Sequence, residues 1–268
     1  RAIELNGVTI DKNKTAFEWG RRAAVDSAAV MRALNPGQVI AFSTKPKQDL
    51  DAMVKFRAEY LTAYQNAAYA RSYVDFVAEV RTAEARQSPD GKLALTEAVA
   101  RYLFKLMAYK DEYEVARLHS DGAMVAKVGQ LFEGNYRLSY NLAPPLWAHK
   151  NDKGELQKAR FGPWMGWAFK VLASLKVLRG TPLDPFGYTA ERREERALVT
   201  EYRAAVQAMV RTLAPHNLQA AVVFARVPEH IRGFGHVKAR HLASARQRWD
   251  QALTDFKCAL PRQETQAT

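Results

Sequence analysis

A basic stretch with two glycines, residues 226–240, has the side chains best suited to bind an anion. The glycines flank a phenylalanine, and cationic or imidazole side chains lie beside them where a helix is predicted to begin; the candidate site residues are Arg232, Gly233, Gly235, His236 and Lys238. Backbone N–H groups at a helix N-terminus attract negative charge, and glycines let an anion approach them closely. The stretch matches neither a Walker A loop nor a dinucleotide fingerprint. It therefore predicts either a site for an anion, phosphate or partner, or a tight turn at which two helices pack.

The histidines and the single cysteine form no recognisable catalytic or metal-binding pattern. The sequence has no HExxH motif, and His236 and His241 are five residues apart, which places them on different faces of a helix. No serine lies in a nucleophile elbow. Cys258 has no histidine partner indicated by the sequence. We therefore predict no catalytic residue and no metal ligand.

A second irregular stretch, residues 179–187, lies between two predicted helices. Prolines at 182 and 185 exclude a helix here, and Gly180 is predicted to be a left-handed cap of the preceding helix, with Arg179 in its basic last turn. Arg179 and Asp184 either pair across this loop and make it rigid, or face a partner. The pattern favours a structural corner.

Most of the chain shows the three-and-four spacing of amphipathic helices. The predicted helices are two within 1–34, one long or two packed helices over 49–86, and others near 99–107, 113–119, 124–132, 164–178, 189–213, 216–226 and 236–256. Aromatic residues recur along 56–76, and this stripe is more typical of a buried face than of a base-stacking surface. Thr189 is the predicted N-cap of its helix.

One segment changes to the period of a β-strand. Apolar residues alternate with polar ones from Tyr136 to Leu142, and residues 146–150, a turn at 151–154 and residues 155–161 have the pattern of a hairpin. The predicted fold is therefore mainly α-helical, a multi-helix domain with one small antiparallel β-hairpin element at about 136–161.

Composition limits the possible functions. The net charge of +12 should attract nucleic acid, a membrane surface, nucleotide phosphates or an acidic protein, or it serves solubility alone. No stretch approaches the apolar length of a transmembrane helix. A single cysteine excludes an internal disulfide, fits a cytoplasmic location, and excludes an iron–sulfur cluster held by this segment alone.

The N-terminus has neither a methionine nor a signal peptide, which indicates a fragment of a longer chain or a processed product. The predicted organisation is an N-terminal helical segment and linker from a missing upstream domain over 1–46, with the linker at 38–46. A helical C-terminal module with the hairpin insertion follows over 47–260, and a flexible tail over 261–268.

Several short sequences resemble the C-terminal region of the fused, single-polypeptide indolepyruvate:ferredoxin oxidoreductases, a family of thiamine-dependent 2-oxoacid:acceptor oxidoreductases. They are AIELNG at 2–7, NK and AF within 13–17, LTAYQN at 61–66, FEGNY at 132–136, LAPP at 142–145, FGPWM at 161–165, the run 178–187 leading into TAERR at 189–193, and residues 231–238. These matches span nearly the whole chain. Departures are confined to the tail and the tip of the hairpin.

The resemblance implies a reaction for the parent enzyme. This family oxidatively decarboxylates aryl pyruvates such as indolepyruvate with coenzyme A, giving the acyl-CoA and reduced ferredoxin. It uses thiamine diphosphate, magnesium and iron–sulfur clusters, whose sites would lie before Arg1. No catalytic residue of the family maps onto this sequence, so the segment is expected to be non-catalytic and to bind no cofactor itself.

The implied role is that of a scaffold or a docking surface. The expected partners are the upstream catalytic domains of the same parent chain, an acidic ferredoxin, and further copies of the parent in a homo-oligomer, with no membrane. An alternative from another class is an independent basic module that binds nucleic acid, suggested by charge alone. The interleaving of basic with acidic residues and the lack of a known binding motif disfavour it.

Overall fold

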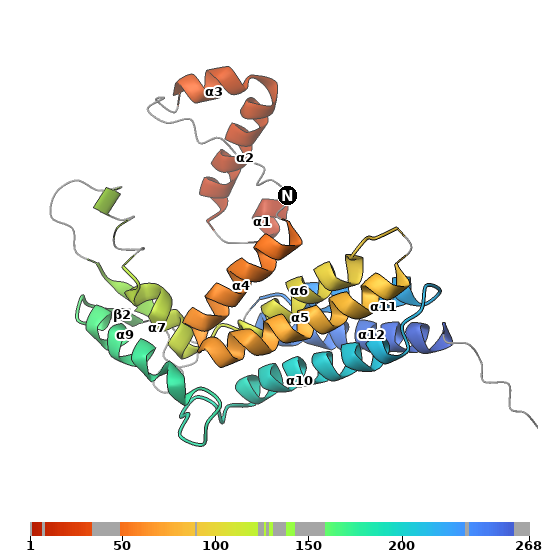
Figure 1. The fold of residues 1–268 in the computed structure, drawn as a ribbon. Coiled ribbons are helices and arrows are strands. Elements are labelled where there is room, and N and C mark those ends of the chain that lie inside the picture. The colour runs from red at the N-terminus through yellow and green to blue at the C-terminus, as the bar shows by residue number, and fades with distance from the viewer. Residues whose placement is uncertain are drawn as a thin grey trace, which may run out of the picture. The chain divides into compact units, whose positions relative to one another are not determined.

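The computed structural model describes residues 2–6, 9–33, 49–88, 90–122, 126, 129–130, 138–142, 159–233 and 236–259. The chain divides into two compact units, Arg1–Gln48 and Asp49–Thr268. The described residues form eleven α-helices, two short 3-10 helices and one two-stranded sheet, which confirms the predicted mainly α-helical fold (Figure 1). The predicted linker at 38–46 and tail at 261–268 lie outside the described residues.

The first unit consists of three helices, α1 (Ala2–Asn6), α2 (Ile10–Val25) and α3 (Ser27–Ala33). The last two confirm the two helical patterns predicted within 1–34. An ion pair between Lys14 and Glu4 joins α1 to α2. None of the described residues of this unit is buried, and Phe17 on α2 is 62% exposed.

The second unit contains the hydrophobic core. Its helical elements are α4 (Leu50–Tyr64), α5 (Ala67–Gln87), α6 (Ala94–Met107), α7 (Glu112–Ser120), α9 (Met165–Ser174), η1 (Leu175–Leu178), α10 (Ala190–Arg211), α11 (Leu218–Arg226), η2 (Val227–His230) and α12 (His236–Cys258). One large apolar cluster joins α4, α5, α6, α10, α11 and α12, whose long helices lie side by side in Figure 1. A smaller cluster joins α7, α9 and the sheet.

The helical region 49–86 is two helices rather than one, because Asn66 starts a new helix. Its side-chain oxygen accepts a hydrogen bond from the Tyr69 N–H at 2.8 Å, which is the contact of an N-cap. The aromatic stripe is mainly core, as predicted: Tyr64 and Tyr73 are fully buried and donate to backbone carbonyl oxygens, whereas Phe56 is 58% exposed.

The sheet confirms a small antiparallel β element. Strand β1 (Tyr140–Leu142) pairs with β2 (Ala159–Phe161), with Tyr140 opposite Phe161. Tyr140 is buried against Phe169 of α9, with ring centroids 5.2 Å apart. The sheet therefore packs on α9 through this ring. The predicted turn at 151–154 and most of the predicted helix at 124–132 lie outside the described residues.

Candidate functional site

A cleft with a volume of about 390 Å³ contains the described part of the basic stretch. It lies between the end of α6 with the residues after it, the first turns of α10, the loop before α12, and the start of α12. Its charged lining residues are Lys105, Lys110, Glu195, Arg232 and Lys238. Four cationic side chains and one carboxylate give the cleft a net positive charge, which attracts an anion.

The structure brings together three of the five candidate residues. Arg232, Gly233 and Lys238 line the cleft. Gly235 and the side chain of His236 lie outside the described residues. The sequence prediction missed Lys105 on α6 and Lys110 just after that helix, which lie more than a hundred residues earlier in the chain. No local pattern in the sequence indicates that proximity.

The cations of the cleft are held by backbone and carboxylate oxygens. Lys105 Nζ donates to the carbonyl oxygens of Pro228 and Glu229 at 2.8 and 3.2 Å. Arg232 Nε donates to the Glu229 carbonyl oxygen at 3.2 Å, and its side chain is 65% exposed. Lys238 forms an ion pair with Glu195. Arg232 therefore has an exposed guanidinium that a ligand can reach.

The surroundings of Lys105 in the cleft lower its pKa. Burial lowers this pKa below its ordinary value, and the charge of Arg232 lowers it further. Glu229 opposes that shift, and Lys238 adds to it. An anion bound between these cations would relieve their mutual repulsion. Among the described residues, the lining of the cleft includes no group arranged for covalent chemistry.

Gly233 has a backbone conformation that favours glycine. Its φ of +83° lies in the left-handed region, and a Cβ placed there would lie 2.6 Å from Val237 Cγ1. The left-handed conformation of Gly233 is typical of a tight turn, and the tight-turn interpretation stays a prediction. The anion-site interpretation stays a prediction.

We expect Gly233→Ala to lower the free energy of unfolding by about 1–3 kcal/mol, because a left-handed alanine is strained and its methyl group meets Val237. Gly180→Ala is the matched control, since Gly180 has a similar φ of +74° with nothing within 4 Å of an added Cβ. Urea unfolding followed by circular dichroism measures both. Equal losses in the two variants would show that the contact with Val237 carries no cost.

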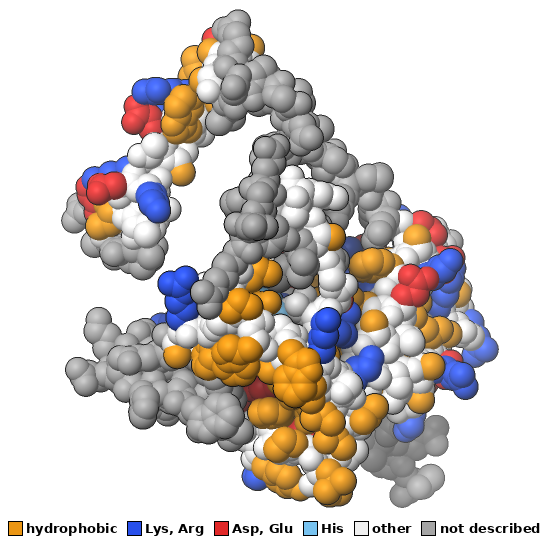
Figure 2. All heavy atoms as spheres, turned by 90° about the vertical axis from the view of Figure 1, so that its left-hand side faces the viewer, with side chains coloured by type: hydrophobic (Ala, Val, Ile, Leu, Met, Phe, Trp, Pro, Cys, Tyr) orange, Lys and Arg blue, Asp and Glu red, His pale blue; other side chains and the backbone are white. Residues whose placement is uncertain are grey.

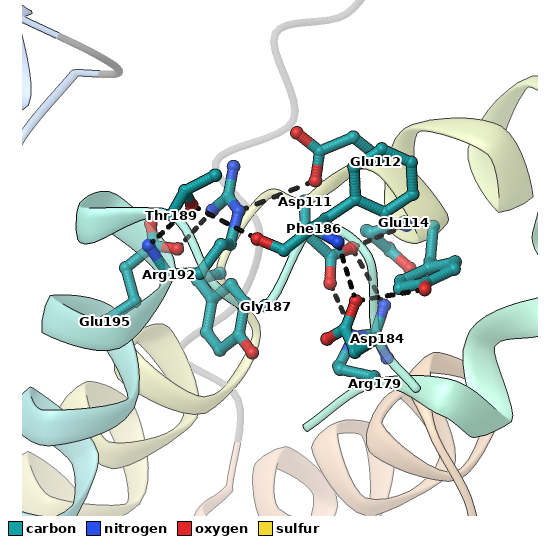
Figure 3. Close-up of polar contacts among 12 residues, drawn as sticks. Asp111, Glu112, Glu114, Arg179, Asp184, Phe186, Gly187, Thr189, Arg192 and Glu195 are labelled. Carbon is teal, nitrogen blue, oxygen red and sulfur yellow. Dashed lines mark hydrogen bonds and ion pairs between the residues drawn. The ribbon is translucent and has the colours of Figure 1, made fainter. Parts of the chain in front are cut away.

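A buried chain of ion pairs lies behind the cleft. Glu195, which is 4% exposed, pairs with Lys238 on one side and with Arg192 on the other. Arg192 Nε also lies 3.5 Å from Glu112 Oε2, so its guanidinium lies between two carboxylates in Figure 3. Burial opposes the charge of Arg192, but Glu195 and Glu112 together raise its pKa. These pairs fix the first turns of α10 against α7 and α12.

Arg179 forms the most buried ion pair of the network. Its Nε and Nη2 donate to the two carboxylate oxygens of Asp111 at 2.5 and 2.9 Å, and its Nη1 donates to the Tyr64 carbonyl oxygen at 2.6 Å. The guanidinium carbon also lies 3.7 Å from the centre of the Tyr64 ring. Asp111 in turn caps α7 by accepting from the Glu114 N–H at 2.8 Å. One arginine thus ties the end of α4 and the start of α7 to the loop after η1.

The predicted pairing of Arg179 with Asp184 is wrong. Asp184 accepts from the N–H groups of Gly180 and Phe186, at 2.9 and 3.1 Å, and from the Tyr113 hydroxyl at 3.0 Å (Figure 3). Its oxygens therefore bond to its own loop and to Tyr113 of α7, and Arg179 bonds to Asp111 instead. Arg179 is the residue directly after η1, and its side chain is 3% exposed.

Other predictions for this loop are confirmed. Residues 179–187 form a structural corner, Gly180 has a left-handed φ of +74°, and the Thr189 hydroxyl accepts from the Arg192 N–H at 3.3 Å as the N-cap of α10. Arg196 Nη2 donates to the Gly187 carbonyl oxygen at 2.7 Å. The corner is thus hydrogen-bonded on the side that faces α10.

Among the described residues, no three His, Cys, Asp or Glu side chains are grouped so that they could hold a metal ion. The described helices also include none with the length and apolar character needed to cross a membrane. Cys258 is exposed.

These features define a helical module with a cationic cleft supported by a buried ion-pair network. Residues 50–251 match the model of a family described as a family of unknown function (DUF6537). Because this match covers 202 of the 268 residues, the chain belongs to that family. Comparisons with curated proteins and with solved structures found no match. The matched segment begins at the first residue of α4, continues into α12, and includes every residue that lines the cleft.

Proposed function

We propose that this chain is the C-terminal helical module of an indolepyruvate:ferredoxin oxidoreductase, and that it acts as a scaffold and docking surface rather than as a catalyst. One observation carries the proposal. Segments that resemble this family lie far apart in the sequence, at 61–66, 178–187, 189–193 and 231–238. Arg179 joins the first two, and Glu195 and Arg196 of α10 bond to the last three. The resemblance therefore extends to the residues that determine the architecture.

The proposed parent enzyme carries out the chemistry in other domains. It oxidatively decarboxylates aryl pyruvates with coenzyme A and passes the electrons to ferredoxin. Thiamine diphosphate, magnesium and the iron–sulfur clusters would be bound by domains upstream of this module. The module would contact those domains and support the assembly of the parent as a homo-oligomer in the cytoplasm. Its cationic cleft is suited to an acidic ferredoxin or to a phosphate group of coenzyme A.

The first experiment is an immunoblot of source-cell extract with an antibody against this segment, followed by an assay of the immunopurified protein. We expect a chain much longer than 268 residues that reduces ferredoxin when given indolepyruvate and coenzyme A. A second assay without coenzyme A controls for unspecific reduction. A chain of this segment's size, with no such activity in any associated protein, would contradict the proposal.

We expect Arg232→Glu in the parent enzyme to raise the KM for ferredoxin or for coenzyme A roughly three- to tenfold at low salt, with kcat little changed. Arg232 is exposed and its removal leaves the buried network intact. Lys238→Gln is the second variant, because a glutamate there would face Glu195. The matched control is Arg71→Glu, an exposed arginine of α5 outside the cleft.

The dependence on salt adds a second readout. The difference in KM between Arg232→Glu and the unchanged enzyme should shrink as ionic strength rises, because salt screens exposed charges. If both KM values are unchanged in Arg232→Glu and Lys238→Gln, the cleft has no part in binding either partner.

A further inference from the structure

Helix α9 is apolar on two opposite faces, and the core covers one of them. On the covered face, Phe169 is 5% exposed and packs with Met165 and Leu172 against α7 and β1. On the other face, Trp164 and Trp167 are 61% and 72% exposed. The apolar spacing over 164–178 predicts a helix but does not show which of its faces is covered. The structure shows that part of its apolar surface is left in solvent.

The exposed residues form a continuous stripe. Trp164, Trp167, Val171 and Leu175 follow one another at spacings of three and four, so they lie on the same side of the helix. Two further exposed apolar side chains lie in η1 and in the corner that follows. We call this set the α9 apolar face, and its members are Trp164, Trp167, Val171, Leu175, Val177 and Leu183. Figure 2, which views the side of the second unit that carries α9, shows a broad hydrophobic surface there.

The α9 apolar face is a large apolar surface to leave in solvent. An aromatic side chain covers about 150–250 Å², so the two tryptophans alone present on the order of 250 Å². The four aliphatic residues are between 41% and 75% exposed and add to this area. Monomeric soluble proteins rarely expose continuous apolar patches larger than a few hundred Å². Tryptophan is also among the residues that contribute most to binding at protein interfaces.

The charges around the face identify the kind of partner. Residues 159–183 contain four cationic residues and no aspartate or glutamate. Of these, Arg160 and Lys170 are exposed, and Lys170 lies on the exposed side of α9. A second copy of the chain would bring the same basic border against itself, at a repulsive cost. A partner whose apolar centre is bordered by carboxylates meets no such repulsion.

From this pattern we infer that the α9 apolar face docks a protein surface with an apolar centre and an acidic border. Trp164 and Trp167 supply the apolar contact, and Lys170 supplies the charge that orients the partner. This surface consists of residues other than those of the cationic cleft. The inference does not depend on the reaction of the parent enzyme.

Photo-crosslinking tests the inference in the full-length protein in its own cells. A benzophenone amino acid replaces Trp167, which is exposed enough for the change to leave the fold intact. We expect a crosslink to one protein segment, located by mass spectrometry, in which apolar residues are flanked by Asp or Glu. The same amino acid at Phe56, an exposed aromatic position on α4, is the matched control and should not give this crosslink.

Charge exchange then separates the possible occupants. Lys170→Glu should lower the yield of the crosslink roughly tenfold, and reversing the mapped carboxylate to lysine should restore it. A crosslink to a second copy of this chain would overturn the inference, as would a crosslink to lipid without any protein product. A protein crosslink whose yield is unchanged in Lys170→Glu would contradict the inference that the partner surface has an acidic border. Failure of the ferredoxin assay described above would leave these outcomes unaffected.

Discussion

The Arg179→Ala variant is expected to lose about 3–5 kcal/mol of unfolding free energy, the cost of removing one partner from a buried ion pair. Both side chains of the pair are 3% exposed. Without the guanidinium, the Asp111 carboxylate keeps its bond to the Glu114 N–H but loses two charge-assisted hydrogen bonds, and the Tyr64 carbonyl oxygen loses one. The stacking of the guanidinium on the Tyr64 ring is lost as well.

Urea unfolding followed by helical circular dichroism measures this loss. Arg193→Ala is the matched control, an exposed arginine of the first turns of α10, and should change the free energy by no more than about 0.5 kcal/mol. Arg179→Lys keeps the charge but not the two-pronged geometry, so an intermediate loss is expected. If Arg179→Ala and Arg193→Ala are equally stable, the buried pair does not stabilise the fold.

A double-mutant cycle shows whether the cost comes from the orphaned carboxylate. Combining Arg179→Met with Asp111→Asn removes both charges at once, and this double variant should be more stable than Arg179→Met alone. A double variant whose loss equals the sum of the two single losses would show that the two side chains are not coupled.

Glu84→Ala should have the second largest effect, a loss of roughly 3 kcal/mol in unfolding free energy. Glu84 is fully buried near the end of α5, and its carboxylate accepts three hydrogen bonds from the first turn of α6. The donors are the N–H groups of Leu95 and Thr96, at 2.8 and 2.7 Å, and the Thr96 hydroxyl at 2.6 Å. The alanine variant leaves these donors without their acceptor inside the protein.

The same urea measurement tests this prediction. Glu79→Ala changes an exposed glutamate on the same helix and should be close to neutral. Glu84→Gln keeps one acceptor oxygen and should fall between the two. A loss in Glu84→Ala no greater than that in Glu79→Ala would mean that water replaces the carboxylate at no cost.

Local signals explain why most of the fold could be predicted. The side chains of Asn66 and Thr189 bond to N–H groups three residues ahead, so a helix start depends on a few neighbouring residues. Gly180 adopts a left-handed conformation that its own lack of a side chain permits. The sequence pattern over 49–86 fits either one long helix or two helices. The N-cap at Asn66 shows that there are two.

The partners of charged residues could not be predicted, because they depend on packing between distant helices. Arg179 lies five residues from Asp184, yet it bonds to Asp111, which is 68 residues away. The prediction of the cleft likewise included Arg232 and Lys238 but missed Lys105. The exposure of Trp167 was hidden for a similar reason, because spacing shows that a face is apolar but not whether another element covers it.

The capping of α6 by Glu84 also determines how these helices open. A helix end normally frays on its own, because its terminal N–H or carbonyl groups have no partner within the helix. Here Glu84, in the last turns of α5, accepts the hydrogen bonds of the first turn of α6. If either helix end unfolds, the other end therefore loses these hydrogen bonds. The two ends therefore form a single cooperative unit. Amide protons at the end of α5 and the start of α6 should then exchange with solvent at a common rate.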